Sequence, residues 1–229
     1  MAIDLFCGLG GWTEGLMAEG YDVIGFDIER HQYGEHKYPA QLVLQDVLTL
    51  HGRQFKDADL IVASPPCQAY SYRAMPWKRA KALPPPDNSL FEACFRIQRE
   101  AIEAAGRHIP LVVENVRGAQ PWVGRARWNF GSFYLWGDVP ALMPIGNHVK
   151  VPSFRFDGSG RSFQTAATRR TDAGNGARFT SRDCAGESQV KVSRKQAAAQ
   201  IAKIPAILST HIARYWRPTQ SLEGSDANG

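Results

Sequence analysis

The sequence has few cysteines and no long apolar run. These two features argue against a disulfide-rich secreted domain and against a membrane-spanning protein. No stretch approaches the roughly 18 consecutive apolar residues of a membrane span, and no charged segment followed by an apolar one opens the chain as a signal peptide would. The four cysteines are scattered, without the dense framework of a small secreted domain. None of the six histidines has metal-ligand spacing with a cysteine or a second histidine. We therefore expect a cytoplasmic protein with no cleaved leader, no membrane contact and no metal site.

Acidic residues are scarce in one segment. From Lys150 to Gln196, ten Lys or Arg stand against four Asp or Glu, whereas the whole chain has a net charge of only +5. The segment is also rich in Gly and Ser and poor in aliphatic residues. This composition is typical of a loop that faces a polyanion, and equally of a solvated surface loop.

The first half of the chain alternates between strand and helix patterns. Hydrophobic residues make up 44% of the 229 residues, enough for one globular domain with a sizeable core. The alternation predicts an α/β fold with a mostly parallel sheet. Strands are expected at 2–6, 21–27, 41–44, 59–64, 110–114 and 132–136. Helices are expected at 12–19, 29–37 and 89–105, the last opened by a capping box at Ser89-Leu90-Phe91-Glu92 and closed by Gly106.

A final helix is expected after Ser193, interrupted at Pro205. Helical spacing predicts that its later part buries Ile207, Leu208, Ile212 and Tyr215. We divide the chain into a catalytic core at 1–149, a basic loop-rich segment at 150–192, a C-terminal helix at 193–217 that returns to the core, and a flexible tail at 218–229.

A glycine-rich turn follows the first expected strand. The run Asp4-Leu5-Phe6-Cys7-Gly8-Leu9-Gly10-Gly11 allows the backbone to turn tightly and to approach a ligand closely. Asp27 stands 19 residues beyond Gly8 at a strand end, where a carboxylate can bind ribose hydroxyls. Asp46, after the third strand, offers an acceptor for an adenine amino group. The alternatives are a structural turn with a surface aspartate, and a capping role for Asp46.

Cys67 lies just past an apolar strand, in Ser64-Pro65-Pro66-Cys67-Gln68. A lone cysteine is more often a small core residue than a nucleophile. Here two prolines stiffen the approach and a polar stretch follows, and loops at strand ends are where open α/β sheets bind ligands. We interpret Cys67 as a nucleophile whose thiolate needs support from nearby groups.

Glu114 and Asn115 end the fifth strand, where a strand-end cap is the alternative to a catalytic role. Parallel strands end at one edge of a sheet, so Glu114 is expected near Cys67. A thiolate that adds to C6 of cytosine makes C5 nucleophilic, and a carboxyl group at N3 stabilises the adduct by sharing or donating a proton. C5 can then take a methyl group from a sulfonium donor, and loss of the C5 proton expels the cysteine.

Three motifs in this order, Asp-x-Phe-x-Gly-x-Gly-Gly, Pro-Pro-Cys-Gln and Glu-Asn-Val, resemble those of DNA cytosine-5 methyltransferases, in particular short phage or prophage members. The resemblance covers residues 2–136 and implies a Rossmann-like class I methyltransferase fold that uses S-adenosyl-L-methionine. It implies Cys67, Glu114 and Asn115 as catalytic residues. It implies a cofactor site at Asp4, Phe6, Gly8, Gly10, Gly11, Asp27, Ile28, Asp46, Val47, Pro65 and Leu90.

The chain departs from the family in three places. The family's Gln-x-Arg-x-Arg motif is not found before Phe130-Gly131. Its arginines have candidate substitutes in Arg125 and Arg127, or in Arg169 and Arg170 after Gln164, although ordinary surface arginines are the simpler account of each pair. The usual Gly-Asn before the last helix is replaced around Ile201-Ala202. The target-recognition region is reduced to the basic segment, which predicts short or relaxed sequence specificity.

Methylation of a base in a duplex requires the base to be flipped out. The loop from Arg73 to Lys81 carries cations for phosphates and bulky groups that can enter the stack, or it is a plain solvated loop. The residues expected to bind DNA are Gln68, Ser71, Arg73, Trp77, Lys78, Arg79, Arg125, Arg127, Arg169 and Arg170.

The resulting hypothesis is a monomeric enzyme of a bacterial or phage-infected cell that methylates cytosine C5 in double-stranded DNA, as in restriction and modification systems. One alternative keeps the chemistry but acts on RNA or transfers another alkyl group. Another is a catalytically weak DNA-binding or decoy protein that keeps the fold. Retention of Cys67 and Glu114 argues against the decoy, because neither residue is needed for DNA binding.

Overall fold

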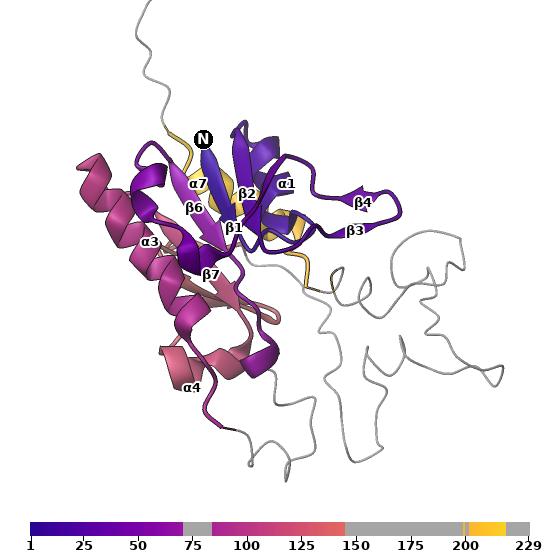
Figure 1. Ribbon diagram of the computed structural model, residues 1–229, viewed down its shortest axis with the longest axis vertical. Coiled ribbons are helices and arrows are strands. Elements are labelled where there is room, and N and C mark those ends of the chain that lie inside the picture. Colours follow the sequence, from indigo (N-terminus) through magenta and orange to yellow (C-terminus); the bar gives the residue numbers. More distant parts are fainter. Residues whose placement is uncertain (71–83, 145–198, 200–201, 219–229) are drawn as a thin grey trace, which may run out of the picture.

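A seven-stranded sheet forms the centre of the protein, and the computed structural model describes residues 1–70, 84–144, 199 and 202–218 (Figure 1). Five strands are parallel and two antiparallel strands extend one edge. The order across the sheet is β5 (Gln41–Leu44), β2 (Val23–Asp27), β1 (Ala2–Leu5), β6 (Leu60–Ala63), β7 (Leu111–Asn115), β9 (Phe133–Gly137) and β8 (Trp128–Phe130). The predicted Rossmann-like α/β fold with a mostly parallel sheet is confirmed.

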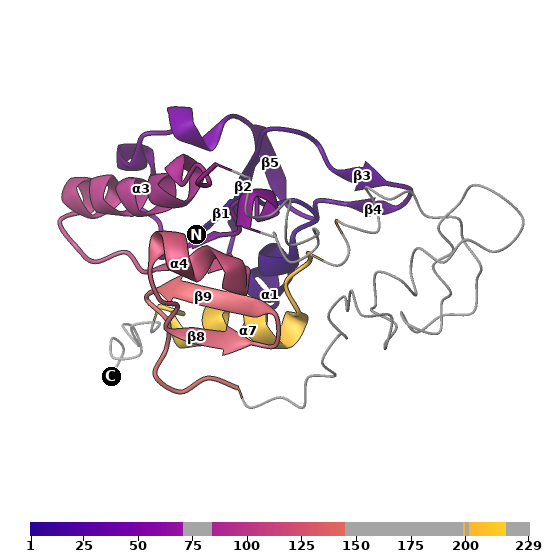
Figure 2. The same ribbon diagram turned by 90° about the horizontal axis from the view of Figure 1, so that it is seen from below.

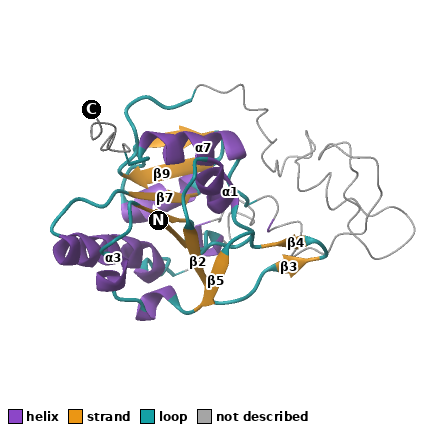
Figure 3. Cartoon of the chain, turned by 90° about the horizontal axis from the view of Figure 1, so that it is seen from above, coloured by secondary structure: helices purple, strands orange, loops and turns teal. Residues whose placement is uncertain are grey.

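Helices cover both faces of the sheet (Figures 2 and 3). On one face lies α3 (Ser89–Ala105), with the short 3₁₀ helices η1 (Val47–Thr49) and η2 (Gly52–Phe55) packed against it. On the other face lie α1 (Gly11–Ala18) and α7 (Ala206–Tyr215), which pack against each other. The chain thus forms three layers, with the sheet in the middle.

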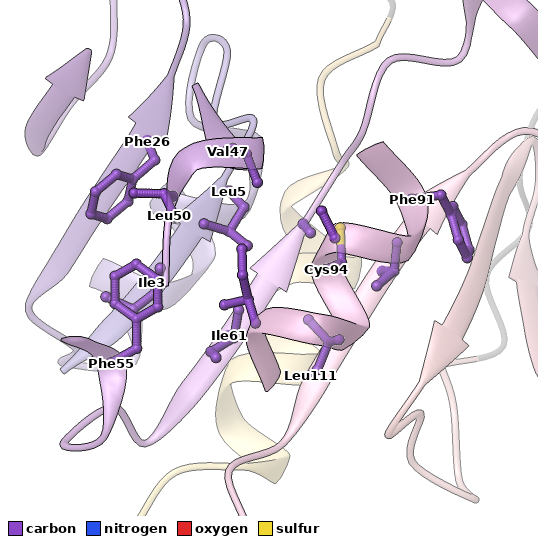
Figure 4. Close-up of a cluster of buried hydrophobic side chains, with 14 of the residues drawn as sticks. Ile3, Leu5, Phe26, Val47, Leu50, Phe55, Ile61, Phe91, Cys94 and Leu111 are labelled. Atoms are coloured by element: carbon purple, nitrogen blue, oxygen red, sulfur yellow. The ribbon is translucent and has the colours of Figure 1, made fainter. Parts of the chain in front are cut away.

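Alternation along the buried strands divides the core in two, because successive strand side chains point to opposite faces. In β6, Ile61 and Ala63 face the cluster under α3, while Leu60 and Val62 face the cluster under α1 and α7. Figure 4 shows the first cluster, in which Phe91 and Cys94 of α3 lie against the sheet. Strands buried on both faces read as continuous apolar runs, which made them visible in the sequence.

The structure corrects two predicted helical features. The helix expected at 29–37 is a hairpin of β3 (Gln32–Tyr33) and β4 (His36–Lys37), because Gly34 adopts a φ of 60° and turns the chain back. The capping box at the start of α3 is not formed. Asn88 is the N-cap, and the Asp87 carboxylate accepts the Ser89 N–H instead (2.8 Å).

The last helix buries a different face from the one predicted. Leu208 and Ile212 are fully buried as expected, but Ile207 and Tyr215 are 54% and 53% exposed. The rest of the buried face consists of the small residues Ser209 and Ala213, which let α7 approach α1 closely. The strand β8 was not predicted, and the expected cap at Ser193 and the segment 150–192 lie outside the described residues.

The contact between α1 and α7 depends on Gly15. A Cβ atom at this position would lie 2.3 Å from Ser209 Oγ and 2.5 Å from the Ser209 carbonyl carbon. We expect Gly15→Ala to destabilise the fold by about 1–3 kcal/mol, because overpacking outweighs the roughly 1 kcal/mol of helix propensity that alanine gains over glycine. Urea unfolding measures the change.

The double variant Gly15→Ala/Ser209→Gly is the matched control, since it removes the clashing Oγ and Cβ atoms but not the backbone carbon. The urea midpoint of this double variant should recover part of the stability that Gly15→Ala loses. A Gly15→Ala protein as stable as the parent would show that the two helices do not pack this closely in solution.

Candidate active site

The candidate site residues lie in one row across the carboxyl edge of the sheet. Leu5 pairs with Phe26 on one side and Ala63 on the other, and Ala63 pairs with Val113. The next residues along these four strands are Phe6, Asp27, Ser64 and Glu114. The register therefore brings together residues that are up to 108 positions apart in the sequence.

The glycine-rich turn leaves an open space in front of the sheet. Phe6, Gly8 and Gly10 have φ values of 58°, 52° and 78°, all in the left-handed region. A Cβ atom at Gly8 would meet nothing within 4 Å, whereas one at Gly10 would lie 2.5 Å from Pro39 Cδ. The turn thus presents its backbone to a ligand at Gly8 and packs against the protein at Gly10. Gly11 begins α1 and approaches Ile204 just as closely.

Asp27 is held by the same turn. Its Oδ2 accepts the Gly8 N–H (2.9 Å) and its Oδ1 accepts the Glu29 N–H (3.2 Å), while His31 Nε2 lies 3.5 Å from Oδ1. Carboxylate oxygens have about four acceptor sites in total, so Asp27 retains capacity for ribose hydroxyls. The expected position of this carboxylate at the end of β2 agrees with the structure.

Apolar side chains stand exposed beside Asp27. Ile28, Leu44 and Leu48 are 74%, 52% and 46% exposed, and Leu44 is the register partner of Asp27. Exposed aliphatic side chains at strand ends suit the face of an adenine ring, whose contact would remove them from water. The residues present therefore fit an adenosine group at the ends of β2 and β5.

Four further residues predicted to bind the cofactor differ in how deeply they are buried. Asp46 Oδ1 accepts the Leu48 N–H (2.9 Å), so this residue caps η1, and it remains half-exposed. Val47 is buried beneath it. Pro65 is buried, and Leu90 is half-buried in the first turn of α3. Contact between these residues and a cofactor remains a prediction.

Asp4 lies in β1 and is fully buried, and its contact with a cofactor remains a prediction. Its Oδ2 accepts the Thr13 hydroxyl (2.6 Å), which also contacts the Tyr38 hydroxyl (2.7 Å). Among the described residues, nothing hydrogen-bonds to its Oδ1. Burial raises the pKa of Asp4 from 3.8 to about 7, despite the Thr13 hydrogen bond and aided by the charge of Asp27. Asp4 therefore joins β1 to α1, and sequence reasoning missed Thr13 and Tyr38.

Cys67 lies beyond the end of β6, next to β7. The Asn115 side-chain amide donates to the Pro65 carbonyl oxygen (2.9 Å), and the Tyr70 N–H donates to the Cys67 carbonyl oxygen (3.0 Å) in η3 (Gln68–Tyr70). The first bond ties the Pro-Pro-Cys segment to β7, and the second closes a local turn within the segment. Cys67 itself is half-buried and Gln68 is exposed, so the thiol is positioned at the surface of a rigid loop.

Glu114 is a buried carboxyl group at the same edge. Burial raises its pKa from 4.5 to about 8, and a hydrogen bond with the Ser64 side chain opposes the rise only in part. The Trp12 indole N–H donates to Ser64 Oγ (3.0 Å). A chain of hydrogen bonds thus runs from α1 through Ser64 to Glu114. Trp12 and Ser64 were not predicted as site residues, although Ser64 directly precedes the Pro-Pro-Cys motif.

The carboxyl edge of β6 and β7 therefore carries a thiol and a buried carboxylic acid with a raised pKa, and the glycine-rich turn follows the neighbouring strand β1. A carboxyl group that keeps its proton near neutrality can donate it to a ring nitrogen. The thiol can add to an electrophilic carbon of the same ring. Glu114 lies in β7 and Cys67 lies four residues beyond the end of β6, so adjacent parallel strands bring both residues to one edge of the sheet.

The predicted nucleic-acid contacts are only partly described. Arg125 and Arg127 are exposed in the loop between α4 (Gln120–Val123) and β8, and Arg117 lies near them in η5 (Arg117–Ala119). The other predicted contacts lie outside the described residues, and they are Ser71, Arg73, Trp77, Lys78, Arg79, Arg169 and Arg170. Within the described ranges, no cluster of His, Cys, Asp or Glu could hold a metal ion. No helix in those ranges is long and apolar enough to cross a membrane.

Residues 1–120 match the family model described as C-5 cytosine-specific DNA methylase. Among solved structures, the chain is similar to a provisionally assigned DNA modification methyltransferase encoded within an E. coli prophage, with 25% identity over 52% of this chain and 32% of that one (TM-score 0.35). It is also similar to the S. pombe Dnmt2 methyltransferase, with 18% identity over 52% of this chain and 35% of that one (TM-score 0.35). The chain spans less than two fifths of the length of either structure. No curated protein sequence matches it.

The raised pKa of Glu114 predicts how stability depends on pH. The folded state holds the proton up to about pH 8, whereas an unfolded Glu releases it near pH 4.5. Between these values the folded state binds more protons, so the free energy of unfolding should fall as the pH rises. Glu114→Gln should flatten this dependence in urea unfolding at pH 5 to 8, leaving the smaller slope due to Asp4 below about pH 7.

The exposed Glu103 provides the control, and Glu103→Gln should leave the pH profile as in the parent. A parent profile that is flat or rises across this range would mean that Glu114 is ionised in the folded protein.

Proposed function

The chain belongs to the C-5 cytosine-specific DNA methylase family, and from this membership we propose that it methylates C5 of cytosine in DNA through a covalent adduct of Cys67. The observation that carries the proposal is the occurrence of the half-buried Cys67 and the buried Glu114, whose pKa is raised, at the carboxyl edge of two adjacent strands. Neither a core role nor a capping role requires both groups at this place.

The family uses S-adenosyl-L-methionine as its methyl donor. When bound, this cofactor supplies an electrophilic methyl group on a sulfonium centre. In this chain Asp27 would hold the ribose, Ile28 would cover one face of the adenine, and the open backbone at Gly8 would admit the methionine part.

Cys67 and Glu114 then act on the cytosine ring. The Cys67 thiolate adds to C6, and Glu114 donates its proton to N3, so that the electron pair of the C5–C6 double bond becomes available at C5. After C5 has gained its methyl group, the C5 proton leaves to water, the double bond re-forms and Cys67 is expelled. The N3 proton returns to Glu114, which restores the starting state of both residues.

Glu114 needs no arginine to carry its proton in this scheme. Burial alone keeps the carboxyl neutral, and the hydrogen bond from Ser64 orients it. Asn115 supports the nucleophile from the same strand by binding the Pro65 carbonyl oxygen. These contacts provide a physical reason why the chain can lack the family's Gln-x-Arg-x-Arg motif and still hold the acid in place.

Cys67→Ala is expected to abolish methyl transfer and to prevent covalent trapping by DNA that contains 5-fluorocytosine, because the other described thiols, Cys7 and Cys94, are buried. Bisulfite sequencing of DNA from cells that express the chain measures activity and sequence context together. Cys94→Ala is the matched control, since Cys94 is buried under α3 and should be dispensable for transfer.

Two results would contradict the mechanism. One is full activity of the Cys67→Ala protein. The other is trapping of 5-fluorocytosine RNA in preference to DNA in direct competition, which would move the same chemistry to an RNA substrate.

Asp27→Asn should weaken the binding of S-adenosyl-L-methionine about tenfold, because one carboxylate acceptor for the ribose becomes an amide donor, a loss of about 1.5 kcal/mol. The remaining oxygen can still accept the Gly8 N–H. Isothermal titration measures the affinity without any methyl transfer. Asp22→Asn alters an exposed carboxylate before β2 and should bind the cofactor as the parent does. Equal affinity of both variants would remove Asp27 from the cofactor site.

A further inference from the structure

Ser64 and Glu114 follow two neighbouring strands at the same level of the sheet. Val62 of β6 pairs with Val112 of β7, and both side chains belong to the cluster under α1 and α7. Ser64 and Glu114 each come two residues later, and side chains two apart along a strand share a face. The Ser64 N–H donates to the Leu5 carbonyl oxygen (3.1 Å), which continues the sheet pattern to this residue. The two side chains therefore lie next to each other on the face that α1 covers.

Ser64 is the polar neighbour of Glu114 across the strands. On its other side Glu114 pairs with Leu135 of β9, which is fully buried. Burial raises the pKa of Glu114 and the Ser64 hydrogen bond lowers it, and these are the two causes of its shift. The other titratable side chains on the elements around it are Cys67 beyond β6, Glu14 of α1 and Tyr134 of β9. The Ser64 hydroxyl is thus the group that orients the buried carboxyl.

The Trp12 indole fixes the direction of this hydrogen bond. An indole N–H can only donate, and that of Trp12 donates to Ser64 Oγ (3.0 Å). The Ser64 hydroxyl has a single hydrogen, and among the described residues Glu114 is the one acceptor for it. Ser64 therefore donates to Glu114 and does not accept from it. A hydroxyl that accepts one hydrogen bond is polarised and donates a stronger one.

Both neighbours of Ser64 are held by regular structure. Trp12 is 2% exposed in the first turn of α1, which begins at Gly11 at the end of the glycine-rich turn. The Asn115 amide of β7 donates to the carbonyl oxygen of Pro65, the residue after Ser64 (2.9 Å). These fixed partners leave the Ser64 hydroxyl little freedom to turn away from Glu114, so its ordering is not a cost of substrate binding.

Donation by Ser64 determines which carboxyl oxygen of Glu114 holds the proton. A neutral carboxyl group has a carbonyl oxygen, which accepts, and a hydroxyl oxygen, which donates. The oxygen that accepts the Ser64 hydrogen is favoured as the carbonyl oxygen, so the proton lies on the other one. Glu114 is 9% exposed, so a ligand at the edge of the sheet can reach the residue.

We propose that Ser64, held by Trp12, is a positioning residue that keeps the proton of Glu114 on the oxygen facing the target base. The identity of the base rests on the proposed function, whereas the place of the proton does not. In the reaction the O–H bond of Glu114 breaks as the N–H bond at N3 forms, and Ser64 retains its own hydrogen. Its hydrogen bond then stabilises the carboxylate that remains, because hydrogen bonds to charged groups are the stronger ones.

The test is the titration of Glu114 in the free protein, followed by the ¹³C chemical shift of labelled glutamate carboxyl carbons. The signal that is missing from Glu114→Gln identifies the residue. A hydrogen bond donated to a carboxylate favours its charged form, so Ser64→Ala should move the Glu114 inflection about one pH unit above the parent value of about 8. If Glu114 instead donates to Ser64, the same variant moves the inflection to lower pH, which contradicts the proposal.

Conservative variants separate the hydroxyl from the space that it fills. Ser64→Thr retains the hydroxyl and should titrate as the parent does. Trp12→Phe removes the N–H but keeps an aromatic ring, and should give a smaller shift in the same direction, because the Ser64 hydrogen bond is weakened but not lost. The matched control is Ser132→Ala, which removes a hydroxyl from the exposed turn between β8 and β9 and should leave the inflection unchanged. Thermal unfolding verifies that each variant is folded.

The pH dependence of single-turnover methyl transfer distinguishes positioning from a structural role. Glu114 acts as an acid only while it holds its proton, so the rate falls as the pH rises through its pKa. Ser64→Ala should move this fall to higher pH by the same amount as the titration. It should also lower the rate at pH 7 about tenfold, because the proton is no longer confined to one oxygen. A purely structural defect would lower the rate at every pH without moving the fall.

The proposal is overturned if the Glu114 inflection of Ser64→Ala stays at the parent value or falls. It is also overturned if Ser64→Thr shifts the inflection as much as Ser64→Ala does. A raised inflection in a chain that never methylates would contradict the proposed function only, and the place of the proton would stand. Methyl transfer with an unshifted inflection would contradict the role of Ser64 only.

Discussion

The in-register pairing of five parallel strands is the constraint on which the rest of this molecule depends. Because β5, β2, β1, β6 and β7 end in the same row, each residue that follows a strand reaches a common edge. Asp27, Ser64 and Glu114 acquire their neighbours in this way, and not through any local motif. The polar groups at this edge contribute little apolar burial. The stability of the sheet comes from its two faces, where helices cover continuous apolar strands.

Burial in the absence of a counter-charge defines the chemistry at this edge. Glu114 is surrounded by apolar strand residues and one hydroxyl, so its neutral form is favoured. The three arginines between β7 and β8 are instead exposed, where water stabilises their charge. Among the described residues, no ion pair joins Glu114 to Arg117, Arg125 or Arg127. A direct pair would have ionised Glu114 and removed the proton that we assign to N3.

The sequence predicted those features that depend on one strand or one turn at a time. The apolar runs of β1, β6 and β7 and the glycine turn were recognisable because their local rules are strong. The hairpin at β3 and β4 was mistaken for a helix, since its short strands bury little and Gly34 alone decides the turn. The hydrogen bonds from Trp12 to Ser64 and from Ser64 to Glu114 were not predictable. They join residues from three separate segments whose approach depends on packing. The exposed face of α7 was predicted wrongly because Gly15 of α1 packs against the small residue Ser209 of α7.

The packing of α1 against α7 has a consequence for how the chain folds. The helix that carries the cofactor turn occupies residues 11–18, and its partner occupies residues 206–215. A nascent chain on the ribosome would therefore complete the sheet edge while the apolar side of Trp12 and Leu16 still lacked its cover. Closure of so long a loop is slow compared with local pairing. The helix α7, which is synthesised late, thus covers the helix α1, which is synthesised early.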